Sequence, residues 1–487
     1  MPYPKVHSFH SVRAIQTYLD ELGVEIPMVD EMSRPGRNPM ASPIRAGDLT
    51  IGNRFAVHPM EGWDATPDGR PTESLLRRWW KFGVSGAGLV WGGEAYAIQQ
   101  DARANPLQLY YQQHADEDLN LLYETVTGAH RDRFGSTDGL VVGLQLTHSG
   151  RFCRPDPPGT LQPRIAYAHP VLNPKFGLPM DYPVLSDGEI QEIIARYAVV
   201  ARTAWNAGFH FVDVKHCHGY LGHEMLSAFT RPGPYGGSFE NRTRFLREIV
   251  SAIRRDAPGL AIGVRISAID LLPYKPDPET SRPGKPGAGV PDDIPGLRPY
   301  VYGFGVDPQS PADTYDMAEP IRFLELLEEL GIHLVNITAG SPYYNPHVQR
   351  PAYFPPSDGY QPPEDPLVGV ARHMAVTGAL KKRFPNLVLV GTGYTYLQEF
   401  LPMAAEAAVA QGLTDMVGVG RMVLSYPTLP ADVLTQGELL HPKQICRTFS
   451  DCTTAPRNHL ISGCYPLDDY YKNTEQHEQL RVIKRSR

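Results

Sequence analysis

The chain has 487 residues, of which 42% are hydrophobic and 20% are charged, as is typical of a globular protein with a substantial core. Its net charge of -7 and its lack of a basic tract argue against a nucleic-acid partner. No apolar run is long enough to cross a membrane, and the first residues lack the apolar stretch of a secretory signal. Because five cysteines do not make a disulfide framework in a chain of this length, we expect a cytoplasmic protein.

Residues 1–45 contain one predicted helix, Val12–Leu22, followed by a Pro/Arg-rich stretch, and we interpret them as an N-terminal extension. From about Ile51 a short apolar strand, a turn and an amphipathic helix repeat along the chain. The predicted strands are Arg54–Val57, Gly88–Trp91, Leu140–Leu146, Phe209–Val214, Leu260–Ile266, Leu334–Ile337, Leu387–Val390 and Asp415–Val419. The predicted helices are Glu73–Phe82, Asp116–Phe134, Ser186–Ala207, Ser238–Asp256, Glu319–Leu330, Val368–Phe384, Tyr396–Gln411 and Leu429–Leu434.

Eight strands that alternate with eight helices predict an α/β fold in which crossover helices join parallel strands. This number of units favours a closed (β/α)8 TIM barrel, residues 46–436, over a doubly wound sheet. No Gly-x-Gly-x-x-Gly motif follows the first strand, which argues against a Rossmann-like alternative. Residues 437–487 would then form a short C-terminal extension.

Two long stretches, Leu271–Pro311 and Pro342–Pro366, interrupt the repeat after the fifth and sixth predicted strands. Both should lie at the C-terminal face of a barrel, where long loops form lids or substrate walls. A surface decoration or a subunit contact is the alternative interpretation.

The polar stretch Lys215-His-Cys-His-Gly-Tyr220 comes directly after the apolar strand Phe209–Val214. A (β/α)8 barrel carries its catalytic residues at the C-terminal ends of its strands, so this stretch is the strongest candidate for a catalytic loop. A polar loop with a chance His-x-His pattern is the alternative.

Other predicted strands also deliver polar side chains to the same end. His58-Pro-Met-Glu61 follows the first strand, while Gln145 and Arg265 belong to the third and the fifth. A buried arginine requires an electron-rich partner. That partner is either a core carboxylate such as Asp213 or a flavin, whose reduced ring carries negative charge that an arginine stabilises.

Glycines follow the last two predicted strands, in Gly391-Thr-Gly393 and in Gly418-Val-Gly420-Arg421. Backbone N–H groups exposed at such glycines can surround a phosphate, and Arg421 would add a bidentate donor. The sequence therefore indicates a phosphorylated cofactor at these two strand ends.

Five separated motifs, in this order, resemble one family. They are Asn53-Arg54 with Pro59-Met60, the stretch Gln145–Arg151, His218–Leu221 followed by Tyr235–Arg242, Val264–Ser267, and Asp415 with Gly420-Arg421. From about Ala46 to Leu434 the chain resembles the Old Yellow Enzyme family of FMN-dependent ene-reductases. The resemblance is strongest to the branch that includes 2,4-dienoyl-CoA reductase and trimethylamine dehydrogenase.

The resemblance implies a cofactor, FMN, and assigns residues to it. The implied FMN contacts are His58, Pro59, Met60, Glu61, Ala95, Gln145, Arg265, Gly391, Gly393, Gly420 and Arg421. The family polarises a substrate carbonyl with two side chains three positions apart, usually His with His or Asn. Here Lys215 and His218 occupy those positions, and Tyr220 occupies that of the proton donor.

Two residues depart from the family pattern. Lys215 replaces the usual histidine, and it could donate to a carbonyl oxygen, hold a substrate carboxylate, act as a general acid with a lowered pKa or leave its place to His216. Together with Arg151 it hints at a carboxylate or a CoA ester as substrate. Glu61 stands where relatives often have Cys or Thr, and a carboxylate there would disfavour the reduced anionic flavin.

We therefore expect hydride transfer from NADH or NADPH through the flavin to an activated C=C bond of an α,β-unsaturated carbonyl or thioester. One alternative is a dehydrogenase of amines or cyclic substrates that passes electrons to an iron–sulfur centre or an electron-transfer protein. Another is a flavin-binding or ligand-binding protein without turnover. We expect a homo-oligomer, with neither a membrane nor a nucleic acid as partner.

Cys446, Cys452 and Cys464 lie where the reductase and dehydrogenase relatives place a four-cysteine iron–sulfur cluster. The eleven-residue interval between Cys452 and Cys464 is kept, but Phe449 stands at the position of the expected second ligand. Because clusters usually need four thiolates, packing alone is one interpretation of this region. A cluster completed by His459 or Asp451, or a zinc site, is the other.

Overall fold

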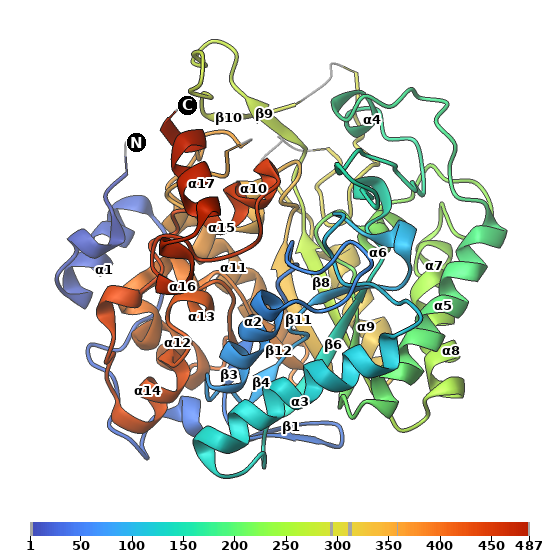
Figure 1. Cartoon of the computed structure of the whole chain (residues 1–487). Helices are drawn as coiled ribbons and strands as arrows, with labels where there is room; N and C mark the ends of the chain where they lie inside the picture. Colours follow the sequence, from blue (N-terminus) through green and yellow to red (C-terminus); the bar gives the residue numbers. More distant parts are fainter. Residues whose placement is uncertain (1–2, 293–295, 310–313, 358, 486–487) are drawn as a thin grey trace.

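The computed structural model describes residues 3–292, 296–309, 314–357 and 359–485. Its centre is a closed ring of eight parallel strands surrounded by helices (Figure 1). The strands are β3 (Phe55–Val57), β4 (Leu89–Val90), β6 (Val141–Thr147), β7 (Phe211–Val214), β8 (Ala261–Ile269), β11 (Leu334–Ala339), β12 (Val388–Gly391) and β13 (Met416–Val419). All eight coincide with predicted strands, and the (β/α)8 prediction is confirmed.

The ring closes because β4 pairs with both β3 and β6, while β13 returns to pair with β3. A short additional strand, β5 (Ala95–Ala97), pairs with the far end of β6. Residues of β6 are buried throughout because one face meets the barrel interior and the other meets the helices. This two-sided burial explains why the strands are short, nearly continuous apolar runs in the sequence.

Helices cover the outside of the ring. Those at predicted positions are α2 (Glu73–Gly83), α3 (Ala115–Phe134), α5 (Asp187–Asn206), α8 (Arg244–Asp256), α9 (Ala318–Glu329), α11 (Pro366–Arg383), α12 (Leu401–Ala410) and α14 (Leu429–Gln436). Helix α5 begins with a capping box in which Ser186 and Glu189 satisfy each other's backbone N–H groups.

Two predicted helices are interrupted. The helix expected over Ser238–Asp256 is divided at Thr243 into α7 (Phe239–Arg242) and α8. The one expected from Tyr396 begins as a 3-10 segment, η5 (Tyr394–Phe400), because Gln398 has a positive φ of 54°. Periodicity alone does not show such breaks, since the apolar spacing continues across them.

The N-terminal residues contain α1 (Val12–Leu22), as predicted, and an antiparallel hairpin of β1 (Ile44–Ala46) and β2 (Leu49–Ile51). Ala46 and Ile51 belong to one apolar cluster with Phe211 and Leu334 from the N-terminal ends of the barrel strands. The hairpin therefore covers the N-terminal opening of the barrel, opposite the end where chemistry is expected (Figure 1).

Of the two long predicted loops, the one after β8 contains the hairpin of β9 (Tyr274–Pro276) and β10 (Gly289–Pro291). Residues 293–295 and 310–311 of this loop, and residue 358 of the loop after β11, lie outside the described part of the chain. The C-terminal residues form short helices from α15 (Asp451–Thr454) to α17 (Glu475–Arg485) above the barrel (Figure 1). Within the described residues, no helix combines the length and the apolar character that a bilayer crossing requires.

Candidate active site

A cavity of about 330 Å³ lies at the C-terminal ends of the barrel strands, within the size range of small-molecule sites. Its walls come from loops after the strands and from a segment of the C-terminal extension, residues 446–471, which we call the C-terminal wall. The predicted site residues that line it are His58, Pro59, Met60, Glu61, Ala95, Gln145, Lys215, His218, Tyr220, Arg265, Gly393, Gly420, Arg421, Cys446, Cys452 and Cys464.

The loop after β7 places Lys215 in the cavity and turns His216 away from it. Successive side chains of an extended segment point to opposite sides. The ring of His216 lies 6.2 Å from that of Phe245 and 5.9 Å from that of Phe323, on the helical side of the barrel. The alternative in which His216 takes the place of Lys215 is therefore wrong.

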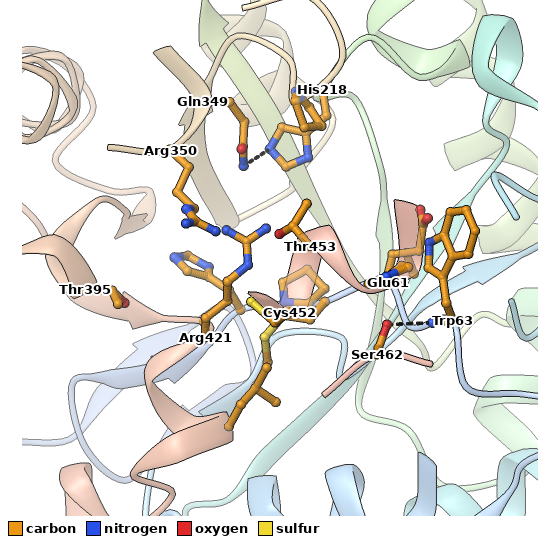
Figure 2. A pocket seen from close by; sticks show the side chains of 18 of the residues that line it. Glu61, Trp63, His218, Gln349, Arg350, Thr395, Arg421, Cys452, Thr453 and Ser462 are labelled. Carbon is orange, nitrogen blue, oxygen red and sulfur yellow. Dashed lines mark hydrogen bonds between the residues drawn. The ribbon is translucent and has the colours of Figure 1, made fainter. Parts of the chain in front are cut away.

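His218 has a positive φ of 66°, which is uncommon for a residue with a Cβ atom. Two serines hold this conformation: the His218 N–H donates to Ser267 Oγ at 2.9 Å, and Ser341 Oγ donates to the His218 carbonyl at 2.8 Å. The imidazole Nε2 lies 3.5 Å from the Gln349 amide nitrogen (Figure 2). Burial, followed by the charge of Arg265, lowers the pKa of His218 well below its ordinary value, so the ring is neutral.

Lys215 is 5% exposed, and its Nζ lies 3.6 Å from the centroid of the Tyr220 ring. Burial lowers the pKa of Lys215, because a charge in a poorly solvated site is costly. Tyr220, which is 3% exposed, has the Lys215 amine against its ring. Arg151, the other predicted substrate-facing cation, is buried with Glu224 at 2.7 Å and does not line the cavity.

Glu61 contacts the predicted proton donor directly. The Tyr220 hydroxyl donates to Glu61 Oε2 at 2.5 Å, and the Tyr343 hydroxyl lies 2.7 Å from the Tyr220 oxygen. Asn105 Nδ2 donates to the other carboxylate oxygen at 3.2 Å. Sequence reasoning had identified Glu61 only as a neighbour of the flavin and had not found its contact with Tyr220.

Arg265 and Gln145 lie where the ring of a flavin is expected. The carboxylate of Asp213 is 0% exposed, and it accepts from Gln145 Nε2 at 2.5 Å, from Trp91 Nε1 at 2.7 Å and from the Arg265 backbone N–H at 2.7 Å. An ion pair between Arg265 and Asp213 is not among the contacts of the described residues. The hydrogen bond that joins these two residues there runs from the Arg265 backbone N–H to the Asp213 carboxylate. Arg265 Nε is buried without a partner among those residues, as a donor for an electron-rich ligand would be.

The loop His58–Glu61 is held in place by residues of the barrel interior and of helix α2. His58 Nδ1 accepts from Asn336 Nδ2 at 3.0 Å inside the barrel. Arg78 donates to the Met60 carbonyl at 3.1 Å and pairs with Glu94 at 2.6 Å. The backbone of this loop is therefore fixed in place before any ligand binds.

Gly391 is the one predicted cofactor residue that does not line the cavity. It is the last residue of β12, and a Cβ added there would meet Thr414 and Tyr394 at 3.2 Å. Thr392 lines the cavity in its place. Gly393 has a φ of 94°, a conformation that favours glycine, and a Cβ on Gly420 would meet nothing closer than 3.8 Å.

Arg350, which sequence reasoning missed, lies beside Arg421 in the cavity, where the two guanidinium groups approach each other (Figure 2). Burial, and next the charge of Arg421, lowers the pKa of Arg350 to about 9. Across the described residues neither arginine forms a salt bridge with a carboxylate, while Arg350 donates to Ser450 Oγ at 2.6 Å. Two adjacent cations next to Gly393 and Gly420 match a dianionic phosphate.

The C-terminal wall is attached to the barrel by several polar contacts. The Trp63 N–H donates to Ser462 Oγ at 2.9 Å (Figure 2). Asp468 accepts from Arg77 at 2.7 and 2.9 Å and from Lys81 at 2.5 Å, which joins the wall to α2. The extension thus completes the cavity, a role that the sequence of the extension did not indicate.

The three C-terminal cysteines line this wall. Within the part of the chain that the structure describes, no three His, Cys, Asp or Glu side chains form a group that could hold a metal ion. Asp451 pairs with Lys484 at 2.7 Å, and Phe449 stacks on Phe354 with ring centroids 5.9 Å apart. Burial raises the pKa of Cys464, which keeps its thiol neutral. The charges of Cys446 and Cys452 both act on Cys464, and an iron–sulfur cluster at these three cysteines stays a prediction.

The cavity as a whole suits FMN. Arg265, whose Nε has no hydrogen-bond partner among the described residues, and Gln145 line the cavity and suit a flavin ring, while Arg350, Arg421 and the open backbone at Gly393 suit its phosphate.

Comparison with known proteins agrees with this geometry. Residues 39–278 match the NADH:flavin oxidoreductase / NADH oxidase family. An NADPH dehydrogenase of Listeria monocytogenes is 32% identical over 408 residues, which cover 82% of this chain and 96% of that relative. An NADPH dehydrogenase of Bacillus cytotoxicus is 26% identical over 413 residues, or 83% of this chain and 95% of the relative.

Solved structures share the fold. A 2-naphthoyl-CoA reductase in complex with 2-naphthoyl-CoA matches with a TM-score of 0.63 and 18% identity, and histamine dehydrogenase from Rhizobium sp. 4-9 with 0.60 and 19%. These matches cover 90% and 88% of this chain, which spans 58% and 52% of the length of those proteins. Morphinone reductase in complex with tetrahydroNAD matches with a TM-score of 0.54 and 21% identity, over 82% of this chain and 91% of that one. The chain belongs to the NADH:flavin oxidoreductase / NADH oxidase family, the Old Yellow Enzyme family that its motifs resemble, and is an FMN-dependent NAD(P)H oxidoreductase.

Proposed function

We propose that the protein reduces the activated C=C bond of an α,β-unsaturated carbonyl compound or thioester. One observation carries the proposal: Lys215, His218 and Tyr220 line the same cavity as the residues suited to FMN. FMN bound there supplies the redox chemistry, a hydride taken from a nicotinamide nucleotide and passed to the β-carbon of the alkene. NADPH is the proposed nucleotide, because the relatives are NADPH dehydrogenases.

Lys215 and His218 have complementary parts in this reaction. The neutral imidazole of His218 and the Lys215 side chain donate hydrogen bonds to the carbonyl oxygen, which stabilises the enolate charge that develops there. Ser267 and Ser341 fix the backbone of His218, so its ring is oriented before the substrate binds. Tyr220 then gives a proton to the α-carbon.

Anaerobic mixing tests the proposal. NADPH should bleach the yellow absorbance of the holoenzyme, and 2-cyclohexen-1-one should restore it as the alkene is reduced. Bleaching by neither NADPH nor NADH, or bleaching that no enone reverses, would contradict the proposed function.

A lysine variant separates substrate activation from flavin reduction. Lys215→Met removes one donor from the carbonyl oxygen, and loss of such a donor costs roughly 10²–10³-fold in rate. We expect that loss in reoxidation by 2-cyclohexen-1-one. His218→Asn keeps a side-chain N–H donor and serves as the matched variant, with a smaller loss expected.

A further inference from the structure

Two further arginines line the cavity besides those that suit FMN. Arg154 belongs to the loop after β6, and Arg457 belongs to the short 3-10 segment η7 (Pro456–Asn458) of the C-terminal wall. Both are half-buried. Arg457 donates to the Pro342 carbonyl at 3.1 Å, whereas the side chain of Arg154 has neither a hydrogen bond nor an ion pair among the described residues. The barrel and the wall thus each contribute one guanidinium group to this part of the cavity.

These two cations lie close to the predicted proton donor. Their charges act on Tyr343, whose hydroxyl oxygen is 2.7 Å from that of Tyr220. Burial, and next the charge of Glu61, raises the pKa of Tyr343, while the hydrogen bond with Tyr220 and the charges of Arg154 and Arg457 oppose that rise. The two arginines are therefore separated from the reacting end of the cavity by about one side chain.

No carboxylate of the cavity wall compensates the charge of Arg154 in the described part of the chain. That wall contains two carboxylates, Glu61 and Asp468. The oxygens of Glu61 accept from Tyr220 at 2.5 Å and from Asn105 at 3.2 Å, while Asp468 is bound by the cations of α2. Because a guanidinium group stays protonated in proteins, Arg154 presents a lasting positive charge to the cavity. Such a group suits an anionic ligand.

Aromatic side chains line the same part of the cavity. Phe176 and Tyr343 belong to its wall. The Tyr343 ring is stacked on that of Phe152 with centroids 4.0 Å apart, and the Phe176 ring meets Phe152 edge-on at 5.3 Å. This surface is fixed by its own packing and suits a flat, unsaturated skeleton.

We propose that Arg154 and Arg457 bind a carboxylate at the far end of the substrate skeleton, so that the enzyme prefers α,β-unsaturated carbonyl compounds that are also acids. This inference rests on the proposed function and narrows its substrate class. Since Tyr343 connects the arginines to Tyr220 through a single hydrogen bond, the acid group belongs to a small skeleton and not to a long chain. A phosphate of the nicotinamide nucleotide is the other anion with suitable chemistry, and the experiment below distinguishes the two.

Paired substrates test this preference. Two probes that carry the acid at different distances from the alkene, 3-carboxy-2-cyclohexen-1-one and 4-carboxybenzylideneacetone, are each compared with their primary amide, which has nearly the same shape but no charge. Holoenzyme reduces them at saturating NADPH. For at least one pair, kcat/KM should be at least about tenfold higher for the acid, because a hydrogen bond to a charged group is that strong. The gain should lie mainly in KM, as is typical of binding remote from the reacting atoms.

Variants locate the source of the preference. Arg154→Met and Arg457→Met should each lower the acid-to-amide ratio of kcat/KM about tenfold, with the amides and 2-cyclohexen-1-one reduced as in the wild type. Arg154→Lys keeps a cation and should retain part of the preference. The matched control is Arg255→Met, which removes the same charge from a side chain that is 69% exposed and pairs with Asp256; it should leave the ratio unchanged. Added salt should weaken the preference in the wild type.

Reduction of the flavin by NADPH and by NADH, followed separately, shows whether the arginines serve the nucleotide. Arg154→Met should leave the apparent dissociation constants of both nucleotides unchanged. A weaker affinity for NADPH together with an unchanged acid-to-amide ratio would assign the arginines to the nucleotide phosphates and overturn the proposal.

The inference and the proposed function fail in different ways. Wild-type enzyme that is reduced by NADPH but reduces none of the acids, amides or 2-cyclohexen-1-one overturns the proposed function and this inference with it. Wild-type enzyme that reduces the acid and the amide of both pairs equally well, or a preference that persists in full in Arg154→Met and in Arg457→Met, overturns this inference alone.

Discussion

Attachment of the C-terminal wall should depend strongly on one carboxylate, that of Asp468. It accepts three hydrogen bonds from the cations Arg77 and Lys81 of α2, and it also accepts from the Tyr470 backbone N–H at 3.2 Å. The side chains of Asp468 and Lys81 are each 8% exposed, while that of Arg77 is 29% exposed. Asp468→Asn removes the negative charge and leaves the Lys81 cation buried beside a neutral amide.

Breaking a buried ion pair by removing one partner costs about 3–5 kcal/mol. The lower end applies here, because Arg77 can turn toward water and Lys81 keeps its contact with the Leu424 carbonyl at 2.5 Å. A cost of about 3 kcal/mol corresponds to roughly a hundredfold increase in local opening of residues 446–471, since each 1.36 kcal/mol is a factor of about ten.

Hydrogen exchange of peptides across the C-terminal wall measures this opening, and fluorescence titration measures the FMN dissociation constant. The matched control is Asp469→Asn, because Asp469 is 90% exposed and pairs only with Lys472 among the described residues. The control should change the stability by less than about 0.5 kcal/mol. Equal exchange rates and equal FMN affinity in the two variants would refute the reasoning.

Acid should reproduce the effect of Asp468→Asn in the wild type. Burial opposes the charge of Asp468, but the hydrogen bonds from Arg77 and the charge of Lys81 hold its pKa below the ordinary value. Its stabilising contribution is thus present above the unfolded-state pKa, near 3.9, and is lost as the pH falls through the folded-state value.

Three further predictions follow from the cavity. Arg265→Met should weaken FMN binding by at least about tenfold in a fluorescence titration yet raise the melting temperature of the apoprotein, because it removes a buried cation whose Nε has no hydrogen-bond partner among the described residues; a lower apoprotein melting temperature would contradict this. Ser341→Ala should lower the rate of enone reduction severalfold without changing FMN affinity, because it frees the carbonyl of His218; unchanged turnover would show that this bond is not needed. Burial raises the pKa of Asp213 to about 6, so the stability that this group contributes should be complete below pH 4 and lost as the pH rises through 6. Urea titrations should show this fall in the free energy of unfolding with pH in the wild type, and they should not show it in Asp213→Asn.

The strands could be predicted from the sequence because each is buried on two sides, and their C-terminal ends carried the candidate residues. For each strand end, the sequence left open which residue points its side chain into the cavity, because a shift of one position along a strand reverses the direction of a side chain. Lys215 lines the cavity, whereas Gly391 does not and its neighbour Thr392 does.

Contacts between distant segments could not be predicted. Glu61 and Tyr220 are joined by a 2.5 Å hydrogen bond across 159 positions of sequence, and no local pattern records such a distance. Arg350 directly follows the short helix α10 (Pro346–Gln349) and donates to Ser450 of the C-terminal extension, a contact between segments 100 positions apart. Both positions become evident only when the barrel brings its loops together.

Because residues 446–471 complete a cavity that begins at β3, uptake of the flavin and ordering of the C-terminal wall are thermodynamically linked. Each should favour the other, so flavin loss would promote detachment of the wall, and detachment would promote flavin loss. The yellow colour of a preparation would then report on the integrity of a segment roughly 400 positions away from the first cofactor loop.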